Sequence, residues 1–158
     1  MKAIHWISAA ALLAYTLPAP ASAGLGDPEI TIYRFSGVRD NGGGENVGVA
    51  TSFHCTNFSG ATENIRFVTR NSDGTIKSNV VLQVPHLNTP TISTHPTNAY
   101  SDNGGTLATG AVTQGTTAIA ATSINVICTA MTIDASTAAP VGVALRGIRF
   151  NPVPGSQE

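Results

Sequence analysis

The chain is poor in charged and aromatic residues. Of its 158 residues, 11% are charged and 6% are aromatic, and the eight lysines and arginines nearly balance the nine aspartates and glutamates. A surface that binds nucleic acid or an anionic membrane needs a basic patch, which this composition does not supply. Residues 24–158 also lack the apolar spacing of three and four that an amphipathic helix requires. The composition therefore disfavours a nucleic-acid partner and a helical fold.

The longest apolar run lies at the N-terminus. Lys2 precedes an apolar stretch over residues 4–17, and residues 21–23 read Ala-Ser-Ala, the small-residue pattern of a signal-peptidase site. The run is too short to span a membrane. We therefore predict a cleaved signal peptide over residues 1–23, with cleavage after Ala23. The expected product is secreted or periplasmic and has no transmembrane segment.

The remaining residues fit a single domain. We expect a flexible leader at residues 24–29, a folded domain at residues 30–150, and a flexible tail at residues 151–158. Short segments that alternate apolar and polar residues recur through the domain, most clearly over residues 47–57. Seven to nine such segments, separated by turn signals, predict an antiparallel β-sandwich.

Three details of this strand pattern are specific enough to test. The turn Asn71-Ser72-Asp73-Gly74 predicts a hairpin between residues 63–70 and 75–84. Residues 106–113 and 117–121 read as two weak strands. In residues 141–150 the alternating apolar positions change from odd to even residue numbers at Arg146-Gly147, which a β-bulge would explain.

The two cysteines, Cys55 and Cys128, lie in separate predicted strands. Cysteines of an exported chain usually pair, and both lie on faces expected to point inward. We therefore predict an inter-sheet disulfide. A metal ligand or a reactive thiol needs a polar or electropositive neighbourhood, whereas Phe53, Val126 and Ile127 supply an apolar one.

Two resemblances follow from these strands. An early and a late cysteine on different strands resemble the immunoglobulin-type sandwich. No tryptophan lies between them, and Val126 stands where that family has a tyrosine, so the fold is immunoglobulin-like in architecture only. The run Gly48-Val-Ala-Thr-Ser-Phe-His-Cys-Thr-Asn, a later Asp-Gly turn, and Cys128-Thr-Ala with a following Asp resemble small secreted bacterial proteins of no assigned function. That resemblance implies an exported β-sandwich of bacterial origin and no catalytic residues.

Motifs for metal binding are sparse. The chain has no H-x-H, H-E-x-x-H or C-x-x-C motif, so the usual local framework of a zinc site is missing. Asp40, Asn41 and Glu45 surround a three-glycine turn and are calcium candidates, because calcium prefers hard oxygen ligands on loops. The same composition is typical of any solvated turn. We predict no cofactor.

Motifs for catalysis are equally sparse. No G-x-S-x-G or other hydrolase signature is present. Neither Glu45 nor Glu63 is expected at an apolar site that would favour acid–base catalysis. We therefore predict that the protein is not an enzyme, and a hydrolase with no recognisable motif is the third choice.

The preferred function is a binding or structural module in the bacterial envelope or the extracellular space. Threonine-rich strands with few lysines leave sheet edges unprotected, which suits strand addition to an envelope or extracellular protein partner, or self-association. The alternative is a carbohydrate or small-ligand binding module. Phe58 and Tyr100, in a turn and a polar loop, are then the ligand-binding candidates.

Overall fold

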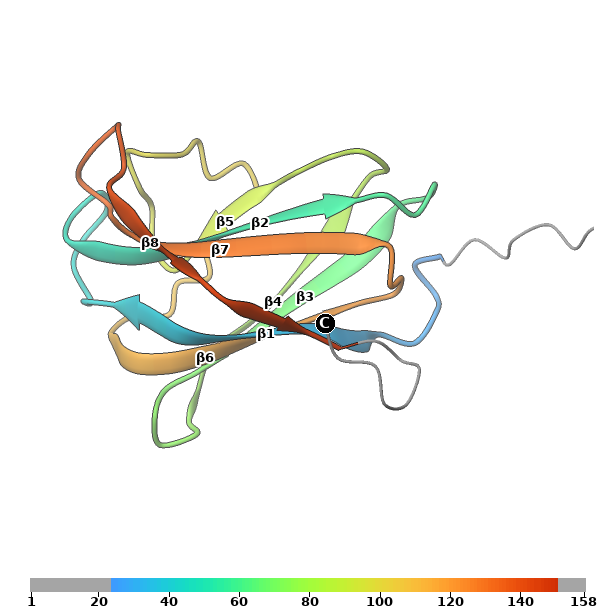
Figure 1. Ribbon diagram of the computed structural model, residues 1–158, viewed down its shortest axis with the longest axis horizontal. Coiled ribbons are helices and arrows are strands. Elements are labelled where there is room, and N and C mark those ends of the chain that lie inside the picture. Colours follow the sequence, from blue (N-terminus) through green and yellow to red (C-terminus); the bar gives the residue numbers. More distant parts are fainter. Residues whose placement is uncertain (1–23, 151–158) are drawn as a thin grey trace, which may run out of the picture.

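The computed structural model describes residues 24–150, which form two antiparallel β-sheets packed face to face (Figure 1). One sheet has the strand order β4-β3-β6-β1-β9 and the other β5-β2-β7-β8. The strands are β1 (Ile30–Asp40), β2 (Val49–Asn57), β3 (Glu63–Arg70), β4 (Ile76–Val84), β5 (Thr91–Ser93), β6 (Val112–Ala121), β7 (Val126–Asp134), β8 (Gly142–Leu145) and β9 (Gly147–Arg149). The predicted all-β sandwich is confirmed. The predicted signal peptide and C-terminal tail lie outside the described residues.

The core lies between the two sheets. Phe53 of β2 sits at its centre, with ring centroids 5.8 Å from Phe35 of β1 and 6.0 Å from Phe67 of β3. All three rings are at most 1% exposed, and burying each contributes roughly 1.5–3 kcal/mol. The hairpin predicted around residues 71–74 is formed by β3 and β4.

Glu63 also faces the core. It shares the inward face of β3 with Ile65 and Phe67 and is fully buried. The Thr122 hydroxyl donates to its Oε2, while Oε1 has no protein partner among residues 24–150. The expectation that Glu63 lies outside an apolar site is wrong, because the alternation of β3 places it on the same face as its apolar neighbours.

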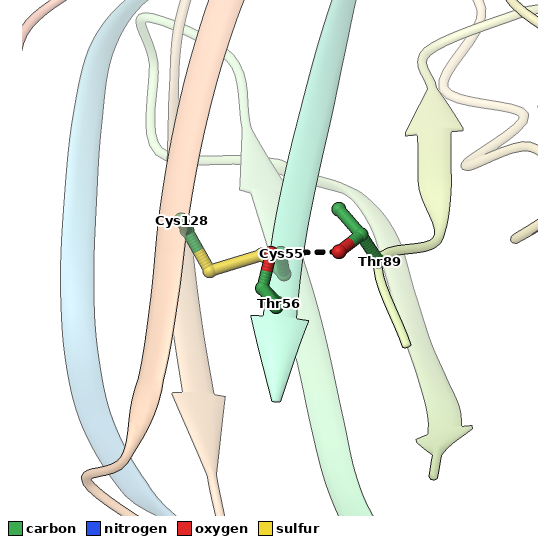
Figure 2. The surroundings of a disulfide bond; sticks show 4 residues. All are labelled: Cys55, Thr56, Thr89 and Cys128. Carbon is green, nitrogen blue, oxygen red and sulfur yellow. Dashed lines mark hydrogen bonds between the residues drawn. A yellow bond between two sulfur atoms is a disulfide. The ribbon is translucent and has the colours of Figure 1, made fainter. Parts of the chain in front are cut away.

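Cys55 and Cys128 form a disulfide, but the bridge lies within one sheet (Figure 2). The two residues are opposite each other on the adjacent strands β2 and β7, with Cα atoms 4.1 Å apart. The Cys55 N–H points away from β7 and donates to the Pro90 carbonyl oxygen at 3.4 Å. The cysteines therefore form a non-hydrogen-bonded pair, the closer type of antiparallel pair.

The predicted inter-sheet bridge is wrong. Inward-facing cysteines can belong to opposite sheets or to neighbouring strands of one sheet, and the sequence does not fix the strand order. The bridge also separates this sandwich from immunoglobulin domains, whose conserved disulfide joins the two sheets. The chain-entropy account assigns a loop of this size about 4 kcal/mol of stabilisation whichever sheet is bridged.

Residues 106–121 differ from the two weak strands that the sequence predicts. Residues 112–121 form the single strand β6, which passes through Gly115 without interruption. A Cβ atom on Gly115 would lie 2.5 Å from the Arg70 carbonyl oxygen, so only glycine allows this close approach. Residues 106–111 instead belong to the connection between β5 and β6, apart from an isolated bridge between Ser93 and Thr106.

The C-terminal segment changes sheet where a β-bulge was predicted. β8 pairs with β7 in one sheet and β9 pairs with β1 in the other, with only Arg146 between them. Figure 1 shows this segment in dark red, crossing from the upper to the lower sheet. A Cβ atom on Gly147 would lie 2.5 Å from the Phe35 ring, so glycine is required at the crossing. The crossing closes one flank of the sandwich and leaves β4 and β5 as the edges of the other.

Candidate functional site

The outer edge of β4 has no paired strand among residues 24–150. Within this described part of the chain, β4 pairs with β3 alone. On β3, the Asn64 N–H donates to Thr122 Oγ1 at 3.1 Å, and the Asn64 carbonyl oxygen accepts from the Thr122 N–H at 3.2 Å. Both backbone groups of Asn64 therefore point toward β6, and its partner Gln83 directs its own N–H and C=O away from β3. By the same alternation, Val81 and Asn79 also present unpaired backbone groups along this edge.

β4 has few of the features that usually protect an edge strand. It is nine residues long, contains no proline, and has Lys77 as its single charged residue. Asn79, Val81 and Gln83 have exposed side chains, while Val84 is buried in the core. Natural edge strands are more often short, charged or interrupted by proline or a bulge. The β4 edge is therefore open to pairing with another strand.

β5, the facing edge of the other sheet, is covered. The connection between β5 and β6, residues 94–111, is called the strap below. It returns alongside β5, where Gly104 and Leu107 donate their N–H groups to the carbonyl oxygens of Thr91 and Ser93, each at 2.8 Å. The Leu107 side chain enters the core and is 2% exposed. The strap thus takes the place of a further strand on this edge.

A groove of about 470 Å³ runs beside the C-terminal half of β4. It lies between β4, the segment that follows it, and the middle of the strap. None of its ten lining residues is charged. They are Leu82, Gln83, Val84, Pro85, Leu87, Asn88, Thr89, Pro90, Asn103 and Gly104.

Leu87 has an unusual backbone conformation at this groove. Its φ is 64°, in the left-handed region that favours glycine or asparagine, and its side chain is 62% exposed. The Leu87 N–H donates to the Asn57 carbonyl oxygen at 2.7 Å, and the Asn57 N–H donates to the Asn88 carbonyl oxygen at 3.2 Å. Asn57 is fully buried, and its side-chain amide binds the carbonyl oxygens of Ala61 and Val84, both at 2.7 Å. In the sequence, Leu87 is marked only by its position between Pro85 and Pro90.

The aromatic ligand-binding candidates lie elsewhere. Tyr100, on the strap, packs on the outer face of the β5-β2-β7-β8 sheet, with its ring centroid 4.5 Å from that of His54 and its hydroxyl donating to Met131 Sδ at 3.0 Å. Burial lowers the pKa of His54, and the charge of Asp102 opposes this shift. Phe58 follows β2 and is 49% exposed. Neither aromatic ring lines the groove, and ligand binding by either stays a prediction.

Of the calcium candidates, Asp40 is buried and its carboxylate is hydrogen-bonded within the protein. It is 2% exposed, and its carboxylate accepts hydrogen bonds from His95 Nδ1 at 2.8 Å, Thr109 Oγ1 at 3.3 Å and the Gly42 N–H at 2.7 Å. Asn41 and Glu45 are exposed. Within residues 24–150, no three or more His, Cys, Asp or Glu side chains form a group that could hold a metal ion. Asp40 therefore anchors both ends of the strap to the end of β1.

These features define a two-sheet antiparallel β-sandwich with an in-sheet disulfide and a long free edge at β4. The part of the chain that is described contains no helix of the length and apolar character needed to cross a membrane. No family model, curated protein or solved structure matches the chain. The resemblance to small secreted bacterial proteins stays a prediction.

Proposed function

We propose that the protein is an exported, non-enzymatic interaction module that binds an extended segment of another protein by adding it to the edge of β4. The observation that carries this proposal is a row of backbone groups at Asn79, Val81 and Gln83 that have no partner among residues 24–150, on an edge strand with a single charge. The disulfide supports export, because disulfides persist in oxidising compartments.

The added segment would become the sixth strand of the β4-β3-β6-β1-β9 sheet. The three outward-facing residues of β4 offer about six backbone hydrogen bonds, each worth about 0.5–1.5 kcal/mol net. Ordering the backbone of the incoming segment costs about 1–2 kcal/mol per residue. Since these two quantities nearly cancel, edge pairing alone gives weak binding. Affinity then depends on the side chains that the added segment places in the groove.

Crosslinking of the tagged chain in the envelope and medium fractions of the source cells, read by mass, tests this proposal. We expect a discrete higher-mass species that contains a second protein. The variant Val81→Pro should abolish it, because proline removes an outward N–H without touching the pairing of β4 with β3. Val81→Thr, which keeps the N–H and suits a strand, should preserve it. Thermal unfolding establishes that both variants fold.

A monomer in every fraction would contradict the proposal. A crosslinked species that survives Val81→Pro would also contradict it, since binding would then not use the β4 edge. A crosslinked species that contains only copies of this chain would show that the chain associates with itself and not with a second protein.

A further inference from the structure

We infer that the groove beside β4 selects an uncharged, extended segment whose central apolar side chain contacts Leu82 and Leu87, and that Leu87 determines this specificity. The inference rests on the proposed strand addition at β4 and adds the chemistry of the partner. Leu82 is half-buried, Leu87 is mostly exposed, and both line the groove.

The backbone of Leu87 indicates a role beyond folding. A leucine with φ of 64° is unfavourable, because its Cβ crowds the backbone in the left-handed region. Glycine or asparagine would occupy the same turn with less strain. The exposed side chain also contributes little to the core. A strained backbone beneath an exposed side chain, at the wall of a groove, is typical of a binding site.

The surroundings of Leu87 hold it in place before any partner arrives. The Asn57 backbone hydrogen-bonds to two consecutive residues of the turn, at the Leu87 N–H and the Asn88 carbonyl oxygen. The Asn88 N–H also donates to the Pro85 carbonyl oxygen at 3.1 Å. A wall fixed in this way loses little conformational entropy on binding, so contacts with Leu87 contribute more of their energy to affinity.

The charge of the groove restricts its occupant. None of the lining residues is charged, so a carboxylate or ammonium group placed there would lose hydration without gaining a counter-ion. The side-chain amides of Gln83 and Asn88 can instead hydrogen-bond to a partner's backbone. The exposed lining of the groove is more polar than apolar. It therefore complements a neutral strand whose backbone meets these amides and whose single leucine, isoleucine or valine side chain meets Leu82 and Leu87, supplied by a second protein.

Peptide binding to the full chain tests the inference. The probes are nine-residue peptides, the length of β4, with threonine at every position except the centre, which carries Leu, Ala, Asp or Lys. We expect the Leu peptide to bind at least about tenfold more tightly than the Asp and Lys peptides. The variant Leu87→Asn should lose about tenfold in affinity for the Leu peptide while its melting temperature stays the same or rises. The rise would follow from relief of the strained backbone.

The possible outcomes distinguish the specificity of the groove from strand addition at the β4 edge. Leu87→Asn with a lower melting temperature and unchanged peptide affinity would overturn the inference, because Leu87 would then be structural. Equal affinity for the Leu and Asp peptides, with all binding lost in Val81→Pro, would overturn it while supporting strand addition. Peptide binding that survives Val81→Pro would overturn strand addition itself. If no peptide bound the wild-type chain, the inference would fail, and crosslinking would still decide whether the β4 edge is used.

Discussion

The two edge strands on the open flank of the sandwich, β4 and β5, differ in whether another segment of the chain covers their edge. The strap covers β5 with backbone hydrogen bonds from Gly104 and Leu107 and fills the space beneath with a buried leucine side chain. β4 is three times as long, with nine residues against three, yet it has no such cover among residues 24–150. Among the described residues, the short edge is thus covered by backbone hydrogen bonds and the long edge is not. The comparison therefore favours β4 as the binding edge.

On the other flank, a strand segment that passes from one sheet to the other covers the edges of both sheets. There the segment of β8 and β9 crosses from one sheet to the other, so each of the two edges it forms is only three or four residues long. Short edges are poor templates for pairing. Of the edges in the described part of the chain, β4 alone is long enough for a stable added strand.

The difference between the covered β5 edge and the open β4 edge depends on the strap. Removal of the Asp40 carboxylate, which anchors the strap, should produce the largest loss of stability. The variant Asp40→Ala deletes the acceptor shared by His95 and Thr109, which anchors both ends of the strap. Loss of a buried, charge-assisted network costs about 3 kcal/mol, so the free energy of unfolding measured in urea should fall by that amount. Glu45→Ala, an exposed change in the adjacent loop, should stay within about 0.5 kcal/mol. Equal effects of the two variants would show that the Asp40 network does not hold the strap.

Loss of Asp102 should have a smaller and more local effect. Its carboxylate accepts from Ser93 Oγ at 2.5 Å and from the Thr97 N–H at 2.9 Å, which ties the strap to β5. Asp102→Ala should lower the free energy of unfolding by about 2 kcal/mol. It should also speed amide hydrogen exchange at Thr91–Ser93, so that β5 behaves more like β4. The exposed neighbour Ser101 provides the control variant Ser101→Ala. Unchanged exchange in β5 would mean that other contacts keep the strap in place.

The sequence predicts the strands of this fold better than their arrangement. Period-two alternation locates β2, β3 and β7, because one face of each strand must be apolar. The disulfide follows from the presence of only two cysteines, but its placement within one sheet does not, because the register of β2 and β7 depends on long-range pairing. The phase shift at Arg146 and Gly147 is visible in the sequence, although a bulge and a change of sheet leave the same pattern.

The candidate site is harder to predict than the strands. A free edge is defined by the absence of a neighbouring strand, which only the topology reveals. The strap is a polar segment without periodicity, and its main anchors, Asp40 and Asp102, look like ordinary loop carboxylates in the sequence. Leu87 is likewise inconspicuous, because the hydrogen bond that holds its backbone is made with Asn57, thirty residues earlier.

The smallest expected effect is a pH dependence confined to the strap side. Burial lowers the pKa of His54, which lies against Tyr100 of the strap, while Asp102 opposes the shift. Because the folded state then binds a proton less readily than the unfolded state, the stability contribution of neutral His54 is complete above about pH 6.5. It is lost as the pH falls from that value through the lowered folded pKa. Protection factors, which correct amide exchange for its intrinsic pH dependence, should therefore fall over this range in the strap and β5, whereas those of β4, which has no histidine, should stay constant. His54→Gln should remove the difference, and an identical pH response in that variant would assign it to another histidine. If the response is absent from β4 and present in the strap, acidification makes the two edges more alike by loosening the covered one.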